Sequence, residues 1–275
     1  MALFVEGENV STAWVNGLDR LLAAGGEAVN LTVAIADPTT EEPAVRSVVD
    51  AFISERRRVR PRSVERISTV ANTIFPQSLY IERLGEGAES HLYDLERRAR
   101  RVTHVRNQRG TYFERMVAWP IDNPRNGQPT QTFNQLDQAV TRLRRLHEQG
   151  LQRGNQFEIG LTAPGDQSIA LPIVVPGRDR QTMGFPCLSH VSLSLQKGIV
   201  HMTALYRNHE FIARGYGNYV GLGRALRFVA QQSGWPIGEL TCVSASVGVG
   251  RGAGFSGGAV KELLEACRRA QKVPS

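Results

Sequence analysis

The sequence has little cysteine, little lysine and no long apolar run, and each shortage excludes a class of protein. Its three cysteines, Cys187, Cys242 and Cys267, are too few and too scattered for a disulfide framework or a zinc finger, so a reducing compartment is expected. No apolar stretch approaches the ~20 residues that a membrane-spanning helix needs. The six histidines form no i, i+4 pair with a carboxylate partner, which argues against a metal site. Residues 1–9 lack the basic and apolar regions of a signal peptide, so a cytoplasmic protein is expected.

Lysine is scarce although the chain is basic. The 33 basic and 26 acidic residues give a net charge of +7, and only three of the basic residues are lysine. Arginine binds phosphate bidentately, so a nucleic-acid-binding protein is one interpretation. A coding sequence rich in G and C is the other. The arginine clusters in 56–60, 97–101 and 142–145 contain no aromatic stacking array and no reader motif, and they could pair with glutamates instead. Nucleic-acid binding is therefore kept as an alternative but is not favoured.

The apolar periodicity predicts helices in the first half of the chain and strands in the second. Helices are expected from a cap at Ser11 or Thr12 to residue 24, and over 42–53, 63–71, 80–101, 134–147 and 219–232, with a last one ending near 269. Strands are expected over 30–36, 156–161, 169–175, 188–196, 199–206 and 240–247. Residues 110–119 are expected to be irregular and 120–132 to form a loop. The pattern favours a single α+β domain that spans residues 1–275, rather than two independent domains, with a mainly helical part at 1–104.

The clearest unit is a hairpin with its turn at Lys197-Gly198. A two-residue loop would place Cys187 opposite residue 208, and a three-residue loop would place it opposite Arg207. In both registers Cys187 and Arg207 are cross-strand neighbours, with Cβ atoms about 5 Å apart where they are directly opposite. A guanidinium so close favours the thiolate, which is the nucleophilic form of cysteine. The alternative is a buried cysteine beside a surface arginine.

Several motifs around this hairpin resemble the thymidylate synthase family. They are Phe185-Pro186-Cys187, the hairpin itself, Leu205-Tyr206-Arg207, and Gly215 followed by Asn218 at the start of a helix. Upstream, Gly110-Thr111-Tyr112 through Trp119-Pro120 and the helix from Asn134 are similar to the family's corresponding segments. The resemblance is clearest over 105–247. It implies a twisted mixed β-sheet flanked by helices, and a homodimer formed through the face of the sheet.

The resemblance also implies a role for each matching residue. Cys187 would attack C6 of a pyrimidine nucleotide and make C5 nucleophilic, so that a one-carbon unit can be transferred to C5. Arg207 would bind the nucleotide phosphate, Asn218 would hydrogen-bond the edge of the base, and Tyr112 would line the pocket. The one-carbon donor of the family is 5,10-methylenetetrahydrofolate. Because an amide both donates and accepts, Asn218 alone does not decide between uracil and cytosine.

The sequence departs from the family in places that matter for turnover. Arg153 alone stands where the family has an arginine pair, and Ser244 to Gly248 replace its sugar-binding His and Tyr. The stretch expected to match the family's early helix lacks its glutamate, although Glu65 is nearby, and the family's C-terminal folate-closing segment is expected to be absent. A catalytically degenerate relative that acts as a nucleotide-binding or protein-interaction module is therefore the alternative to an active methyl- or hydroxymethyltransferase. Turnover needs an acid or base near Cys187, and His190, His201 and His209 are the candidates.

A glycine-rich loop, 248–258, precedes the last helix. It matches G-x-G-x-x-G, but no second strand with an acidic residue follows, which excludes a dinucleotide-binding unit. Free N–H groups at a helix N-terminus can hold a phosphate or a sugar oxygen. Gly252 and Gly254 are therefore predicted to contact substrate, with Arg251 assisting. The alternative is a loop whose glycines only make turns.

Overall fold

The computed structural model describes two compact units of the chain. One unit comprises Met1–Asn72, Ala204–Arg224 and Glu239–Ser275, and the other comprises Thr73–Thr203 and Ala225–Gly238. No helix among the residues described is both long and apolar enough to cross a membrane. The residues described are 2–61, 63–80, 88–103, 110–120, 131–152, 170–175, 186–250 and 254–272.

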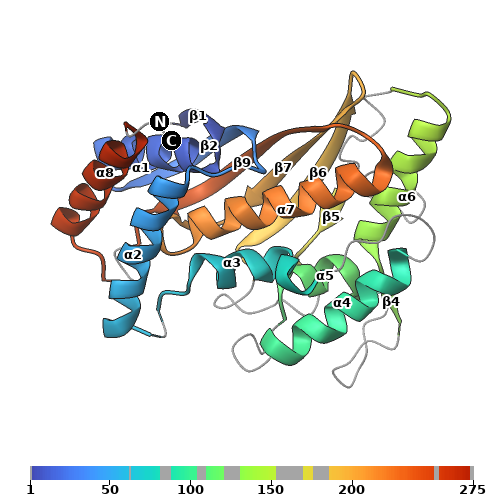
Figure 1. The fold of residues 1–275 in the computed structure, drawn as a ribbon, viewed down its shortest axis with the longest axis horizontal. Coiled ribbons are helices and arrows are strands. Elements are labelled where there is room, and N and C mark those ends of the chain that lie inside the picture. The colour runs from blue at the N-terminus through green and yellow to red at the C-terminus, as the bar shows by residue number, and fades with distance from the viewer. Residues whose placement is uncertain are drawn as a thin grey trace. The chain divides into compact units, whose positions relative to one another are not determined.

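The first unit opens with a parallel β-α-β arrangement. Strand β1 (Leu3–Asn9) pairs in parallel with β2 (Glu27–Asp37), and α1 (Val10–Ala23) joins them and packs against both, as Figure 1 shows. The side chain of Asn9 accepts the N–H of Thr12 and caps the helix. The helix was predicted, but its cap lies two or three residues earlier than expected. Strand β1 was not predicted, because its short segment also carries acidic residues.

Two further strands make the sheet of this unit mixed. Strand β9 (Ile237–Gly248) runs antiparallel to β2, with Leu31 opposite Ser244. The short strand β8 (His209–Glu210) runs parallel to β9, with His209 opposite Val247. A mixed sheet with helices confirms the predicted α+β class. The thymidylate synthase-like arrangement remains a prediction.

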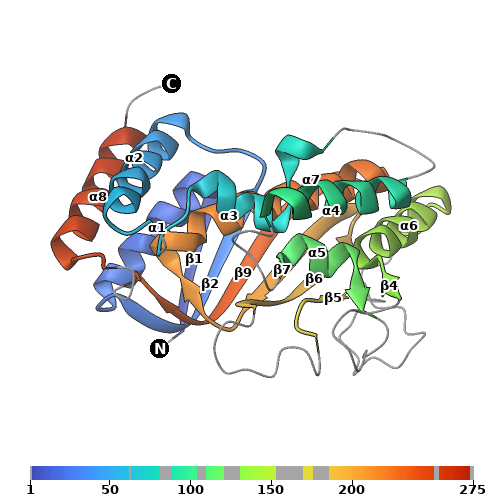
Figure 2. The same ribbon diagram turned by 90° about the horizontal axis from the view of Figure 1, so that it is seen from below.

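The core of the first unit lies between its strands and α1. Helices α2 (Pro43–Val59) and α8 (Gly257–Gln271) pack against each other, and α8 also contacts α1, as Figures 1 and 2 show. Phe52 of α2 stacks on Phe255 just before α8, with ring centroids 5.5 Å apart. Helices α3 (Ile67–Ile74) and α7 (Tyr216–Ser233) begin in this unit. Fully buried side chains of the core include Trp14, Leu18, Leu21, Leu31, Val33, Ile35, Leu240 and Cys242.

The second unit carries the predicted hairpin. Strands β6 (Leu188–Gln196) and β7 (Ile199–Tyr206) have the predicted bounds, and β7 continues into the first unit after Thr203. Lys197 and Gly198 have φ values of +51° and +75°. Two successive positive φ values are typical of a two-residue type I′ turn, so the two-residue loop is the one present. Strand β5 (Ala170–Pro172) pairs antiparallel with β6.

Helices and one short ribbon complete the second unit. The predicted helix over 134–147 is α6 (Gln135–Glu148), and Asn134 caps it by accepting the N–H of Asp137. Residues 112–117 were expected to be irregular but form α5, which Thr111 caps through the N–H of Glu114. The predicted strand over 156–161 lies outside the described residues. The remaining elements are η1 (Gln77–Leu79), α4 (Ala88–Thr103), β3 (Trp119–Pro120) and β4 (Thr132–Phe133).

Gly223 of α7 tests the packing of the first unit. A Cβ at this position would lie 1.9 Å from the carbonyl oxygen of Pro38, which is a backbone atom that cannot move aside cheaply. We expect Gly223→Ala to destabilise the protein by about 1–3 kcal/mol in spite of its better helix propensity. Gly258→Ala in α8 meets open space and is the matched control, expected to be neutral or stabilising. Urea unfolding of the three proteins measures this, and equal effects of the two substitutions would contradict the packing.

Candidate functional site

A buried histidine links three elements of the first unit. His209 lies on β8 with 2% of its surface exposed. Its Nδ1 lies 2.9 Å from Oγ of Ser244 on β9, and its Nε2 lies 3.0 Å from Nδ2 of Asn218 on α7. Ser244 and Asn218 are also buried. The predicted base-binding residue Asn218 is therefore hydrogen-bonded to His209, nine residues earlier, and through His209 it is linked to Ser244 on β9.

The direction of these hydrogen bonds follows from the chemistry of the amide. An amide nitrogen only donates, so Nε2 of His209 accepts from Nδ2 of Asn218. A neutral imidazole carries its one hydrogen on the other nitrogen, so Nδ1 donates to Oγ of Ser244. We call Asn218, His209 and Ser244, joined in this order, the amide relay.

Aromatic rings enclose the imidazole and keep it neutral. The ring of Tyr206 stacks on His209 with centroids 4.3 Å apart and an interplanar angle of 5°. Tyr219 and Phe211 present their rings at steeper angles, with centroids 5.8 and 6.4 Å away. Burial lowers the pKa of His209 from 6.5 to about 3, because no water solvates the imidazolium. His209, one of the predicted acid or base candidates, is therefore uncharged at neutral pH, and both of its ring nitrogens are engaged in hydrogen bonds.

A second set of contacts fixes the start of α7, two residues before Asn218. A π-helical turn, η2 (Phe211–Gly215), leads into the helix. Trp14 of α1 stacks on Phe211 and donates its Nε1–H to the carbonyl oxygen of Phe211. Tyr216, the first residue of α7, shares a 2.7 Å hydrogen bond with Oγ of Ser11. Helix α1 thus anchors the turn that presents Asn218.

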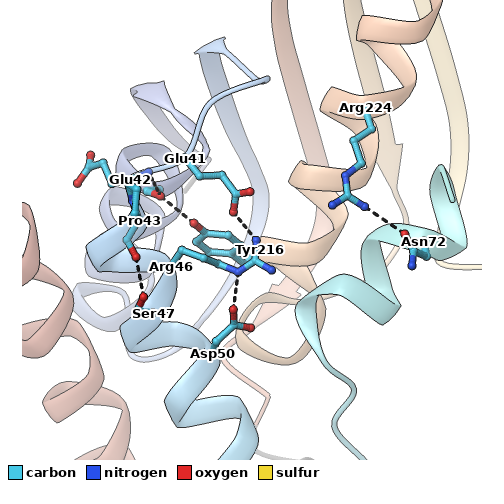
Figure 3. A network of polar contacts seen from close by, with 10 residues as sticks. Glu41, Glu42, Pro43, Arg46, Ser47, Asp50, Asn72, Tyr216 and Arg224 are labelled. Atoms are coloured by element: carbon cyan, nitrogen blue, oxygen red, sulfur yellow. Dashed lines mark hydrogen bonds and ion pairs between the residues drawn. The ribbon is translucent and has the colours of Figure 1, made fainter. Parts of the chain in front are cut away.

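Arg46 extends this anchoring to α2 (Figure 3). Its guanidinium pairs with Glu41 at 2.6 Å and with Asp50 at 2.7 Å, and it lies over the ring of Tyr216. Further along α7, half-buried Arg224 donates to Oδ1 of Asn72 at 3.1 Å. Burial lowers the pKa of Arg224. Arg46 and Arg224 thus bind acceptor groups of the first unit itself.

Several residues of the basic clusters also have partners within the chain. Arg57 donates to the carbonyl oxygen of Val64 and lies 3.6 Å from Glu65. Arg144 donates twice to the carbonyl oxygen of Gln232. Arg97 pairs with Asp94 one turn earlier on α4. These contacts account for part of the arginine excess without a nucleic acid.

Cys187 lies directly before β6 and is half-buried, with no disulfide partner. Arg207 follows β7 directly and is also half-buried. The two residues belong to different compact units, so their predicted proximity remains a prediction. The other two thiols are poor nucleophiles, because burial raises the pKa of Cys242 well above its usual value and that of Cys267 to about 12.

The remaining predicted substrate contacts lie at helix starts or outside the described residues. Tyr112 is the first residue of α5 and is half-buried. Gly252 and Arg251 lie outside the described residues. Gly254 has a φ of +80°, and a Cβ there would lie 2.7 Å from Cζ of Arg60. Glycine is needed at 254 for that backbone conformation. The predicted contact of Gly254 with substrate remains a prediction.

A buried carboxyl group in the second unit was not predicted from the sequence as a site residue. Glu96 of α4 has 7% of its surface exposed, and its Oε1 has no hydrogen-bond partner among the described residues. Burial, with Glu114 nearby, raises the pKa of Glu96. Burial also lowers the pKa of His190 on β6. Among the described residues, no group of acidic, histidine or cysteine side chains could hold a metal ion.

Comparison with known proteins supports a relation to thymidylate synthases over part of the chain. A protein of Methanosarcina barkeri, provisionally named a thymidylate synthase, is 31% identical over 72 residues, which are 26% of this chain and 33% of that protein. A protein of Methanosarcina acetivorans with the same provisional name is 33% identical over 75 residues, which are 27% of this chain and 35% of that protein. Another of Methanococcoides burtonii is 32% identical over 72 residues, which are 26% of this chain and 33% of that protein. The chain thus matches about a third of the length of these relatives. No family model matches it.

The buried neutral His209 predicts an acid-sensitive fold. Its folded pKa of about 3 lies below the unfolded value of 6.5, so its contribution is complete above pH 6.5 and is lost as the pH falls towards 3. Between pH 7 and pH 5 we expect this group alone to remove about 2 kcal/mol of unfolding free energy. His209→Phe keeps a ring against Tyr206 but does not titrate. Urea unfolding at both pH values should therefore show a smaller loss in the variant, and equal losses would contradict the buried neutral state.

The three thiols should differ in reactivity. We expect iodoacetamide to alkylate Cys187 in the folded protein at least about tenfold faster than Cys242 or Cys267, whose raised pKa values suppress the thiolate. Peptide mass spectrometry after short exposure at pH 8 identifies the labelled residue. Unfolding in guanidinium chloride should equalise the three rates. Preferential labelling of a buried thiol in the native protein would contradict this assignment.

Proposed function

We propose that the chain binds a pyrimidine nucleotide and forms a covalent adduct between Sγ of Cys187 and C6 of the base. The observation that supports this most is the buried amide of Asn218, which a neutral imidazole holds at the start of α7. An oriented amide in a closed environment suits the polar edge of a base. The partial similarity to proteins named as thymidylate synthases points to the same substrate class.

In the proposed reaction the thiolate of Cys187 adds to C6, and the electron pair of the C5–C6 double bond moves to C5. C5 then forms a bond to a one-carbon electrophile, the hydrogen of C5 leaves as a proton, and the Sγ–C6 bond breaks to restore the double bond. Arg207 neutralises the nucleotide phosphate, and Asn218 holds the polar edge of the ring. Tyr112 lines the pocket.

A folate is the one-carbon donor that the resemblance implies. When bound, 5,10-methylenetetrahydrofolate would supply the carbon that is added to C5. The polar groups assigned above, Asn218 and Arg207, suit a base and a phosphate, and no set of described residues is matched to a pterin.

Binding without turnover is the second proposed function. Replacement of the family's sugar-binding histidine and tyrosine by the segment 244–248 favours it, because Ser244 is turned inward to His209 and is not available to a sugar. In this case Asn218 still binds the base, but Cys187 forms no adduct. A homodimer formed through the sheet face is part of both proposals.

An intact-mass experiment with 5-fluoropyrimidine nucleotides tests the proposal. The protein is incubated with the uracil and cytosine forms, each as ribo- and deoxyribonucleotide, with and without 5,10-methylenetetrahydrofolate. Fluorine at C5 cannot leave as the proton does, so an adduct that has already bonded to the one-carbon unit should persist and raise the mass by one nucleotide plus the folate. Without the folate, an adduct should raise the mass by one nucleotide alone. Cys187→Ala should abolish the adduct, and Cys267→Ala, which removes a buried thiol, should retain it.

Each outcome separates the two functions. An adduct that depends on Cys187 supports covalent chemistry and identifies the base and sugar. Binding by calorimetry with no adduct in the folded protein supports the non-catalytic alternative. Neither binding nor an adduct with any of the nucleotides would reject both proposals. Steeply salt-dependent binding to a random DNA duplex would then favour the nucleic-acid alternative.

A further inference from the structure

We propose that His209 and Ser244 fix the direction of the Asn218 amide and so make the chain discriminate between uracil and cytosine. This inference rests on the proposed function, because it takes Asn218 as the residue that faces the base. His209 and Ser244 are then positioning residues, which act on specificity through Asn218 and do not touch the substrate.

The two bases differ in the order of their donors and acceptors. Uracil presents the N3–H donor beside the O4 acceptor, and cytosine presents the N3 acceptor beside the N4–H donor. An amide offers one N–H and one carbonyl oxygen side by side. Held in one direction, it matches one base with two hydrogen bonds and opposes donor to donor and acceptor to acceptor on the other. Rotating the amide by 180° reverses this preference.

The amide relay sets this direction in the structure. One N–H of Asn218 is directed to Nε2 of His209 at 3.0 Å, and no other described residue hydrogen-bonds the side chain of Asn218. The carbonyl oxygen Oδ1 and the second N–H therefore remain for a base. Turned around, the amide would direct Oδ1 at the lone pair of Nε2, which repels it.

Reversing the amide requires three groups to change together. The imidazole hydrogen would have to move from Nδ1 to Nε2, and the hydroxyl of Ser244 would have to change from acceptor to donor. Ser244 is fully buried and His209 is 2% exposed, so water cannot readily assist this exchange. The ring of Tyr206 lies flat against the imidazole and opposes its rotation. The direction of the amide is thus set by packing and by hydrogen bonding at once.

The test compares the affinities of uracil and cytosine nucleotides by calorimetry. The nucleotides are the 5′-monophosphates with the same sugar, so they differ only in the base. We expect the wild-type protein to prefer one base at least about tenfold, which corresponds to about 1.4 kcal/mol. In His209→Phe and in Ser244→Ala the ratio of the two dissociation constants should fall towards one, with the preferred base losing affinity.

Tyr219→Phe is the matched control. Tyr219 packs its ring edge against the same imidazole at 5.8 Å, and its buried hydroxyl has no hydrogen-bond partner among the described residues. It lies outside the relay, so its substitution should leave the ratio unchanged. If the relay substitutions had a purely structural effect, the dissociation constants of both nucleotides would rise by the same factor. Circular dichroism and thermal melting show whether each variant is folded, and Ser244→Ala serves if His209→Phe does not fold.

The outcomes distinguish this inference from the proposed function. A wild-type protein that binds neither nucleotide rejects the proposed function. A wild-type protein that binds both bases equally, or relay variants that keep the wild-type ratio, would overturn the positioning role while nucleotide binding stands. A ratio that falls in both relay variants and not in Tyr219→Phe is the result expected.

Discussion

The described part of the first unit depends on one imidazole that must stay uncharged. His209 accepts a hydrogen bond from Asn218 of α7 and donates one to Ser244 of β9, which lies 35 residues further along the chain than His209. The imidazole thus connects a helix to a strand. Desolvation makes the charged form costly, and the two hydrogen bonds make the neutral form favourable in one tautomer. The stacked ring of Tyr206 and the anchored turn at Phe211 hold the imidazole in place. The direction of the Asn218 amide follows from these constraints.

Several arginines of this chain join elements within the protein. Arg46 joins α2 to the first residue of α7, Arg224 joins α7 to α3, and Arg144 joins α6 to the end of α7 within the second unit. A planar guanidinium with five donors can satisfy several carbonyl and carboxylate oxygens at once, which lysine cannot do. The guanidinium groups of these three arginines are therefore engaged in contacts within the protein.

Local pattern and turn chemistry predicted the hairpin, whose strands have the expected bounds, because an alternation of period two and a Lys-Gly turn are local signals. Helix α6 was predicted from apolar residues spaced three and four apart, which is also a local signal. Helix α5 was missed because it has only six residues, and strand β1 was missed because its segment carries acidic residues. The relation of His209 to Ser244 and Asn218 could not be predicted, since it arises when β8 pairs with β9. Asn218 itself was found by resemblance, and its partners were found by structure.

The amide relay also constrains how the sequence can change over time. Loss of the His209 imidazole leaves the buried Ser244 hydroxyl and the buried Asn218 amide each without this hydrogen bond. Loss of Ser244 or Asn218 leaves one ring nitrogen of His209 without a hydrogen-bond partner. Each single change is thus disfavoured, whereas a concerted replacement by apolar side chains of similar shape could be tolerated. Positions 209, 218 and 244 are therefore expected to be inherited as one unit, so that a descendant keeps all three polar groups or abandons them together.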